Sequence, residues 1–211
     1  MARNILILGN AGAARECYWG LREVMERDAT LRFKGFLAFE GHPENLRDLA
    51  SLQLENDESY RLEPGDEIIL GLGEAGLRRR AFAKWKTRGA RFMNLIFPTC
   101  SISGELDMGE ANIIGYASGI SNNVRMGNGN FLNGRVLFGH DVSIGDFNFF
   151  GPDSIVLGQA SLGSLNTVGV RSVIMPKARL GDGNTVVPGS FVYKGCKDNQ
   201  MLMGNPALPV T

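Results

Sequence analysis

Gly109-Glu-Ala-Asn112 is the first of five Gly-x-x-Asn tetrapeptides that recur every 18 residues along this chain. The later copies are Gly127-Asn-Gly-Asn130, Gly145-Asp-Phe-Asn148, Gly163-Ser-Leu-Asn166 and Gly181-Asp-Gly-Asn184. A finer period of six accompanies them, because every sixth residue from Ile96 to Val192 is apolar, 17 in succession. With 44% of all residues apolar, a run of this length has a chance probability of roughly one in a million.

A period of six inside a period of 18 predicts a parallel β-helix, with three short strands in each coil and about five coils. One apolar side chain of each strand is expected to point into the prism. Glycine and asparagine are expected at the corners, where the backbone needs a positive φ. The five asparagines that end the tetrapeptides are expected to form one column through the stack.

Length, charge and cysteine content narrow the class of protein. The 211 residues suffice for one domain or two small ones, and 22 basic residues balance 22 acidic ones. This balance argues against a nucleic-acid or membrane-surface partner. No stretch approaches the ~20 apolar residues of a membrane span, and the N-terminus lacks a signal-peptide pattern. Three cysteines without metal-ligand spacing predict free thiols in a reducing cytoplasm.

Residues 1–97 lack the six-residue apolar period of residues 98–211, which predicts two domains. No low-complexity linker separates them, so we expect the domains to pack rigidly together. Strands are expected at 4–8, 33–39, 67–72 and 92–96, and helices at 13–27 and 75–88. The polar segment 42–64 is expected to be a loop with one helical turn near 43–51. Strands that alternate with helices predict a small parallel, Rossmann-like sheet.

A strand, then Gly9-Asn10-Ala11-Gly12, then a helix is an arrangement that binds phosphate. Glycines let the backbone approach a ligand, and the helix N-terminus offers free N–H groups. Gly73, at the end of the third strand, is expected at the same edge of the sheet. The alternative is a tight turn without a ligand. The basic residues of the second helix are expected to form a solvated face, with phosphate contact as the alternative: Arg78, Arg79, Arg80, Lys84, Lys86 and Arg88.

His140 is the principal catalytic candidate among the 2 histidines. His42 lies in a polar Gly-His-Pro loop and is expected at the surface, whereas His140 follows the inward Phe138 and precedes Asp141. An imidazole can take a proton from an attacking amine or hydroxyl, and a carboxylate can fix its tautomer. A coil corner could bring the two side chains together; the alternative is a solvated corner histidine. Cysteine and serine nucleophiles lack a partner pattern, and a three-histidine metal site lacks histidines.

Together these features resemble one subfamily of bacterial sugar acetyltransferases, which place a small nucleotide-sugar-binding domain before a left-handed β-helix. It includes sialic acid O-acetyltransferases and N-acetyltransferases of UDP- or GDP-linked 4-amino sugars. The segment Ile5-Leu-Ile-Leu-Gly-Asn-Ala-Gly-Ala-Ala-Arg-Glu16 is similar to the family's strand–glycine–helix opening. Phe92-Met-Asn-Leu-Ile-Phe-Pro98 resembles the segment that leads into its β-helix, and Gly204-Asn-Pro-Ala207 resembles its closing tail near coenzyme A.

The resemblance implies an acetyl-CoA-dependent acetyltransferase without a metal, with His140 as the general base, Asp141 orienting it and Asn133 near the acceptor. Gly9, Asn10, Gly12 and Gly73 are then expected at the phosphates of the sugar acceptor. Along the coenzyme we expect Gly158, Gly204, Asn205 and Pro206. The resemblance also implies a homotrimer with active sites between adjacent β-helices.

Three departures from the family pattern bear on the acceptor. Ala13 stands where a histidine is usual, Phe36-Leu-Ala-Phe39 followed by Glu40 replaces a pair of base-binding aspartates, and Phe149 replaces a second histidine. The catalytic residues match the family pattern whereas the nucleotide-base contacts do not, so the sequence supports acetyl transfer better than it supports the nucleotide of the acceptor. With the glycine turn after the first strand, we expect N-acetylation of a nucleotide-linked amino sugar for a bacterial surface glycan. O-acetylation of sialic acid or a related sugar is the nearest alternative, and a non-catalytic sugar-binding scaffold is a third. The sequence names neither the sugar nor the nucleotide, and it does not separate amine from hydroxyl.

Overall fold

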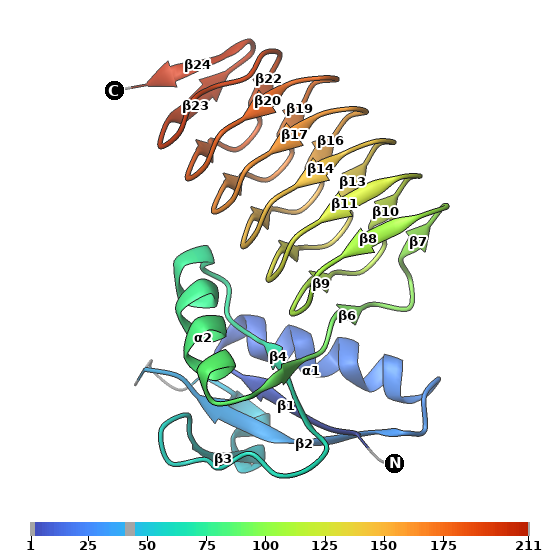
Figure 1. The fold of residues 1–211 in the computed structure, drawn as a ribbon, viewed down its shortest axis with the longest axis vertical. Coiled ribbons are helices and arrows are strands. Elements are labelled where there is room, and N and C mark those ends of the chain that lie inside the picture. The colour runs from blue at the N-terminus through green and yellow to red at the C-terminus, as the bar shows by residue number, and fades with distance from the viewer. Residues whose placement is uncertain (1–2, 41–44, 211) are drawn as a thin grey trace.

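Two parts stack along the long axis of the molecule in the computed structural model, which describes residues 3–40 and 45–210 (Figure 1). The lower part, the sheet domain, runs in the order β1 (Arg3–Leu8), α1 (Gly12–Met25), β2 (Leu31–Ala38), a 3-10 helix (Arg47–Leu52), β3 (Gln53–Asn56), β4 (Asp66–Leu70), α2 (Ala75–Thr87) and β5 (Arg91–Phe92). Within the described residues its sheet has five parallel strands in the order β3-β2-β1-β4-β5. The predicted parallel α/β sheet is confirmed.

Two predictions for the sheet domain are wrong. β3 lies in the segment expected to be loop, where Gln53 extends the sheet by pairing with Phe36 of β2. The single strand expected over 92–96 is two strands that serve different sheets, because β5 pairs with β4 whereas β6 (Leu95–Ile96) pairs with β9 of the β-helix. The 3-10 helix overlaps the helical turn expected near 43–51. His42 lies outside the described residues.

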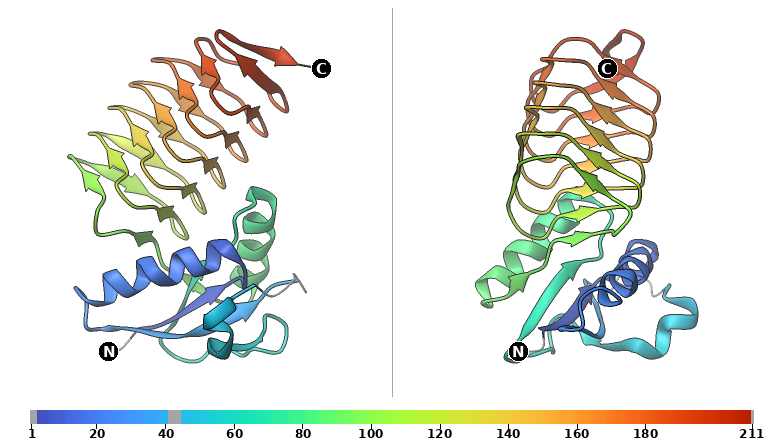
Figure 2. Two further views of the ribbon diagram at one scale, coloured as in Figure 1. Left: turned by 180° about the vertical axis from the view of Figure 1, so that it is seen from behind. Right: turned by 90° about the vertical axis from the view of Figure 1, so that its right-hand side faces the viewer.

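The second part is a left-handed parallel β-helix whose short strands form three flat faces (Figure 2). The face on which α1 of the sheet domain packs is called the docked face. It holds β6, β9 (Ile113–Ile114), β12 (Phe131–Leu132), β15 (Phe149–Phe150), β18 (Thr167–Val168), β21 (Thr185–Val186) and the closing antiparallel hairpin β23 (Met201–Gly204) and β24 (Ala207–Val210). The apolar face holds β7 (Ser101–Ile102), β10 (Gly119–Ile120), β13 (Leu137–Phe138), β16 (Ile155–Val156), β19 (Val173–Ile174) and β22 (Phe191–Val192). The polar face holds β8 (Leu106–Met108), β11 (Val124–Met126), β14 (Ser143–Ile144), β17 (Ser161–Leu162) and β20 (Arg179–Leu180).

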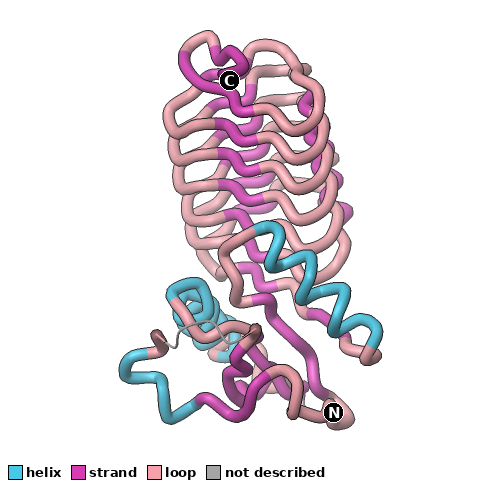
Figure 3. Tube along the Cα trace, turned by 90° about the vertical axis from the view of Figure 1, so that its left-hand side faces the viewer, coloured by secondary structure: helices cyan, strands magenta, loops and turns pink. Residues whose placement is uncertain are grey.

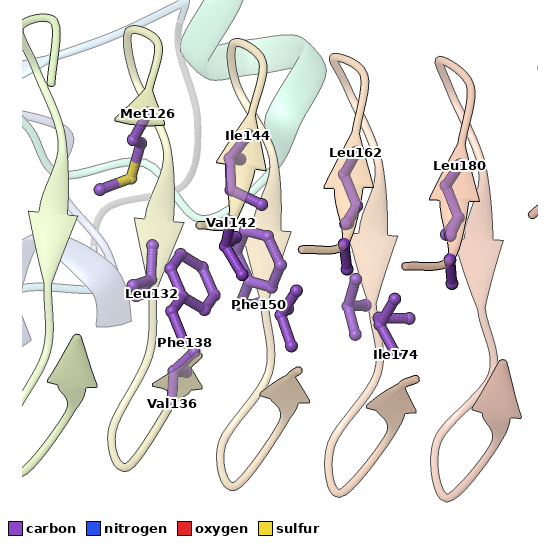
Figure 4. Packing of buried hydrophobic residues seen from close by; sticks show 14 of the residues in the cluster. Met126, Leu132, Val136, Phe138, Val142, Ile144, Phe150, Leu162, Ile174 and Leu180 are labelled. Carbon is purple, nitrogen blue, oxygen red and sulfur yellow. The ribbon is translucent and has the colours of Figure 1, made fainter. Parts of the chain in front are cut away.

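The six-residue period marks the side chains that fill the prism. Figure 4 shows Met126, Leu132, Phe138, Ile144 and Phe150 among the residues pointing into the space between the strands, all of them buried. The rings of Phe138 and Phe150 meet edge to face, with centroids 5.0 Å apart. Ile102, in the first coil, is 38% exposed. The predicted inward positions are otherwise buried or packed against this core.

The asparagine column exists, but the prediction for the corners is wrong in detail. The Asn130 side-chain amide donates to Asn112 Oδ1 at 3.1 Å, and Asn148 donates to Asn130 Oδ1 at 3.0 Å. The five column asparagines are all fully buried. Positive φ falls one residue before each asparagine, as at Phe147 with φ 54°. The repeated glycines serve close approach instead: a Cβ on Gly127 would lie 2.1 Å from Asp146 Oδ1 in the next coil.

Arg78 joins the two parts of the chain, and the prediction that it lies on a solvated face is wrong. Its side chain is fully buried, and its guanidinium donates to the carbonyl oxygens of Leu70 at 2.5 Å and Leu72 at 3.0 Å within the sheet domain. It also donates to Ala111 O at 2.9 Å and Gly129 O at 2.8 Å in the β-helix. Burial lowers the pKa of Arg78 to about 10, so the guanidinium remains charged at neutral pH.

The two helices lie against different parts of the β-helix (Figure 3). α2 packs beside the corner between the polar and docked faces, where the Phe82 ring lies 5.4 Å from that of Phe147 and Lys86 pairs with Glu110 at 2.5 Å. α1 lies across the docked face and shares a core with Ile113 and Phe131. Among the described residues, no helix combines the length and apolarity that spanning a membrane requires.

Candidate active site

His140 lies on the corner between the apolar and polar faces, directly after β13. The turn places Asp141 at φ 59°, and this conformation folds the carboxylate back beside the imidazole. His140 Nδ1 lies 2.7 Å from Asp141 Oδ2, and the two side chains are 61% and 42% exposed. Because the carboxylate accepts from Nδ1–H, the neutral imidazole carries its lone pair on Nε2.

A third residue holds the carboxylate in place. Asn123, one coil below Asp141, donates from Nδ2 to Asp141 Oδ1 at 2.6 Å. The hydrogen bond with His140 and then that with Asn123 lower the pKa of Asp141. The carboxylate is therefore ionised wherever the imidazole can act as a base. Asn123 was not predicted, although it stands 18 residues before Asp141 and the coil period points to it.

Gly158 lies one coil above His140, against the imidazole ring. A Cβ at Gly158 would stand 2.8 Å from His140 Nε2 and 3.0 Å from Cε1. The Gly158 N–H has no backbone acceptor among the described residues, whereas the next residue, Gln159, donates from its N–H to His140 O at 2.9 Å. This corner therefore presents a basic nitrogen and an unpaired N–H donor side by side, an arrangement suited to acyl transfer.

The three glycines expected at the phosphates of the acceptor, Gly9, Gly12 and Gly73, differ in their surroundings. A Cβ on Gly9 would lie 2.4 Å from Gly71 O, so Gly9 is required by the packing of the chain itself. At Gly12 and Gly73 a Cβ would meet only single atoms at 4.0 Å. Gly73 lines a pocket of about 380 Å³ at the carboxyl ends of β1 and β4, together with Asn10, Ala11 and Ala13. Gly12 is not among the residues that line this pocket. α1 and α2 both begin at this edge without a side-chain N-cap.

Most of the other basic residues on α2 or directly after it are paired within the chain. Lys84 pairs with Asp57 at 2.6 Å, and Arg88 donates to two backbone carbonyls. Arg80 pairs at 2.9 Å with Glu40, the residue after the stretch that replaces the expected aspartates. These contacts leave Arg79 as the exposed arginine of α2 without an ion pair among the described residues.

Asn133 and His140 are not brought together within one chain. Asn133 follows β12 at the corner between the docked and apolar faces, so that the width of the apolar face separates it from His140. Asn133 lines a cleft of about 210 Å³ between α1 and the first coils, together with Glu16, Trp19, Phe97 and Tyr116. No local pattern predicts the other walls of this cleft, because the docking of α1 on the first coils creates it.

The residues expected along the coenzyme lie in two places. Gly158 is on the His140 corner, whereas Gly204, Asn205 and Pro206 form the turn of the β23–β24 hairpin. β23 lies three strands above β15 on the docked face, or about 14 Å at the usual strand spacing. A second pocket of about 350 Å³ adjoins the hairpin and includes Tyr193, Lys194 and Pro206. In the part of the chain that the structure describes, no group of three or more His, Cys, Asp or Glu side chains could hold a metal ion.

Comparison with known proteins supports the architecture of the whole chain. No protein-family model and no curated protein matches it. A histidine-to-asparagine mutant of perosamine N-acetyltransferase from Caulobacter crescentus, in complex with CoA and GDP-perosamine, has a TM-score of 0.86 at 19% identity, over 99% of this chain and 97% of that one. WeeI from Acinetobacter baumannii gives 0.84 at 19%, over 99% and 100%. The acetyltransferase domain of PglB from Neisseria gonorrhoeae, in complex with acetyl coenzyme A, gives 0.86 at 18%, over 100% of each chain.

Proposed function

We propose that this chain is an acetyl-CoA-dependent N-acetyltransferase that acts on a nucleotide-linked amino sugar in the synthesis of a bacterial surface glycan. The observation that carries the proposal is the chain of contacts from Asn123 through Asp141 to His140, which fixes an exposed imidazole beside the bare Gly158. The similar structures from Caulobacter crescentus and Neisseria gonorrhoeae, which contain CoA with GDP-perosamine and acetyl coenzyme A, support the same class of reaction.

His140 acts as the general base in this mechanism. The acceptor amine attacks the thioester carbonyl carbon and forms the C–N bond, while His140 Nε2 takes the amine proton. Asp141 stabilises the imidazolium that results. The Gly158 N–H donates to the oxyanion of the tetrahedral intermediate. Collapse of the intermediate breaks the C–S bond, and the imidazolium returns its proton to the departing thiolate.

The pocket at the carboxyl ends of β1 and β4 is suited to the phosphates of the acceptor. Gly73 in its lining leaves room for a phosphate to approach the backbone closely. α1 begins beside Ala11 and Ala13 of the lining, with the free N–H groups and partial positive charge of a helix N-terminus. Asn10, which is 4% exposed, also lines the pocket. Asn133 and the cleft beside α1 continue from this pocket toward the β-helix.

Acetyl-CoA is proposed to lie along the corner above His140, toward the hairpin that holds Gly204, Asn205 and Pro206. The corner residues Asp141, Gln159 and Lys177 share a positive φ at successive coils, so their side chains leave the prism in one row. Lys177 is exposed and has no ion pair among the described residues, which suits it to a phosphate of the coenzyme.

The proposal includes a homotrimer, and the contrast between the three faces supports it. The docked face is covered by α1 in its first coils, and the polar face points residues such as Arg125 and Ser143 outward. The apolar face points a column of Leu137, Ile155, Val173 and Phe191 outward, each directly above the last. Packing three apolar faces around one axis would bury this column and bring the Asn133 corner of one copy beside the His140 corner of the next. The proposal also places the protein in the cytoplasm. Its three cysteines are free thiols, as is usual in a reducing compartment, and acetyl-CoA is made there.

The proposal is tested by the release of free CoA from acetyl-CoA, with the wild type beside His140→Ala. The acceptors are UDP-, GDP- and dTDP-linked amino sugars and free sialic acid. We expect release with one nucleotide-linked amino sugar, reduced by about 10²–10⁴ in His140→Ala, while the circular dichroism spectrum is unchanged. Equal turnover in the variant would refute His140 as the base. Release of CoA with sialic acid alone would indicate that the acceptor group is a hydroxyl and not an amine.

A further inference from the structure

The cleft between α1 and the first coils has a chemical character that the phosphate pocket lacks. Trp19 is 53% exposed and Tyr116 is 47% exposed, although both border a cleft that also contains Phe97, Ile113 and Phe131. Large exposed aromatic side chains that converge on a concave surface mark a binding site. The volume of about 210 Å³ suits a single sugar ring.

Tyr116 is held in place before any ligand binds. Its ring lies over Gly134, where a Cβ would stand 2.3 Å from Tyr116 Cε1. Its hydroxyl accepts from Arg135 Nη1 at 2.9 Å. Arg135 is itself fixed by two contacts with Asp153, at 2.6 and 2.8 Å. The exposed ring is therefore a rigid platform, which binds at low entropic cost.

The charge of the cleft has one sign. Glu16 is the carboxylate among its described lining residues, and no lysine, arginine or histidine lines it. Burial raises the pKa of the Cys17 thiol to about 12, so the floor of the cleft is neutral. Arg135, behind Tyr116, is already engaged by Asp153. A cationic ammonium group has a partner here, whereas the carboxylate of a sugar acid has none.

The cleft and the phosphate pocket lie along one face of α1. Ala13 lines the phosphate pocket and Glu16 and Cys17 line the cleft, which is the spacing of residues on one side of a helix. Glu16 lies four residues beyond Gly12, or about 6 Å along the helix axis. A sugar whose anomeric phosphate rests at the start of α1 therefore places its ring beside Glu16 and Trp19.

We propose that this cleft is the sugar-ring subsite, in which Trp19 and Tyr116 contact the faces of the ring and Glu16 accepts a hydrogen bond from its amino group. The proposal rests on the proposed function and deepens it, because Glu16 selects an amino sugar and rejects a sialic acid. Glu16 is here a specificity-determining residue, distinct from the base His140.

Trp19 itself reports on binding without catalysis. The chain has 2 tryptophans, and Trp85 is fully buried, so acrylamide quenches the fluorescence of Trp19 selectively. Saturating UDP- or GDP-linked 4-amino-4-deoxyhexose is expected to reduce this quenching at least about twofold, and N-acetylneuraminic acid is expected to leave it unchanged. Trp19→Phe supplies the background from Trp85.

Steady-state kinetics of variants then test whether Glu16 and Trp19 bind the sugar. Glu16→Gln and Trp19→Ala are each expected to raise the KM for the amino sugar about tenfold with kcat within about threefold. Glu23→Gln, two turns further along α1 and outside the cleft, is the matched control and keeps the wild-type KM.

The outcomes separate this proposal from the function it rests on. Protection of Trp19 without CoA release supports the subsite and refutes the acetyltransferase. CoA release with unchanged KM in both Glu16→Gln and Trp19→Ala refutes the subsite and leaves the acetyltransferase standing. Absence of protection by every amino sugar, or protection by N-acetylneuraminic acid that Glu16→Gln does not alter, also overturns the subsite.

Discussion

Replacing Gly158 by alanine is expected to place a methyl group against the imidazole of His140 without disturbing the β-helix. The new Cβ would lie 2.8 Å from His140 Nε2 and 3.1 Å from Cδ2, whereas ordinary contact needs about 3.5 Å or more. The backbone can accept the change, because Gly158 is not among the glycines with positive φ. The half-exposed imidazole must therefore swing aside, by a substantial fraction of an ångström at its ring atoms, and lose its alignment with Asp141.

A displacement of this order in a catalytic group reduces turnover by about 10²-fold. Since the imidazole can move into solvent, we expect the free energy of unfolding to change by less than about 0.5 kcal/mol. Both quantities are measurable, the first by CoA release and the second by guanidinium denaturation. The decisive control is Gly158→Ala in the His140→Ala background, where no ring remains to be displaced and no further loss of kcat is expected. A full additional loss there would refute this explanation and assign the effect to the coenzyme or the oxyanion.

Three further perturbations test other contacts. Asp141→Asn should lower kcat by about 10²-fold or more. A kcat equal to that of the wild type would contradict the role proposed for Asp141. Arg78→Met removes a buried donor shared by backbone carbonyls of both parts of the chain and should destabilise the protein by about 3–5 kcal/mol. The melting temperature should fall by roughly 10 °C, while the exposed Arg79→Met changes neither quantity. Asn148→Leu removes one rung of the buried column and should cost about 2–4 kcal/mol in guanidinium denaturation, with equal stability counting against the column.

The periodic part of the fold was predictable because burial repeats with the coil. Each inward side chain, such as Leu132 or Ile144, meets the same environment in every turn, so the apolar period survives in the sequence. The corner conformation has no such signature. Phe147 and Leu165 adopt φ 54° and 62° although neither residue type favours that region. Hydrogen bonds between coils impose it, such as that from Phe147 N to Asn128 O at 2.8 Å.

The candidate site, like the fold, has contacts between sequence neighbours and contacts between segments that are far apart in the chain. The contact between His140 and Asp141 was predictable because the two residues are adjacent in the chain. Glu16 and Trp19 were not, because the cleft forms only when α1 packs on coils about 100 residues later in the chain. Arg78 lies in a run of three arginines, and only the docking of α2 distinguishes this buried residue from its two exposed neighbours.

The proposed mechanism combines Asn133 and His140, which lie apart within one chain, so it calls for a second copy of the chain and the proposed homotrimer can be tested directly. If each active site combines the Asn133 corner of one copy with the His140 corner of the next, two inactive variants can complement each other. Trimers are reassembled from equal amounts of Asn133→Ala and His140→Ala. A site is intact when its asparagine comes from a His140→Ala chain and its histidine comes from an Asn133→Ala chain. Random assembly produces this arrangement at about one interface in four, so the mixture should recover about a quarter of the wild-type CoA release. Recovery requires subunit exchange, which a brief unfolding and refolding of the mixture provides, and refolded single variants are the controls. Sites built within one chain predict no recovery at all, because every chain in the mixture carries a defect.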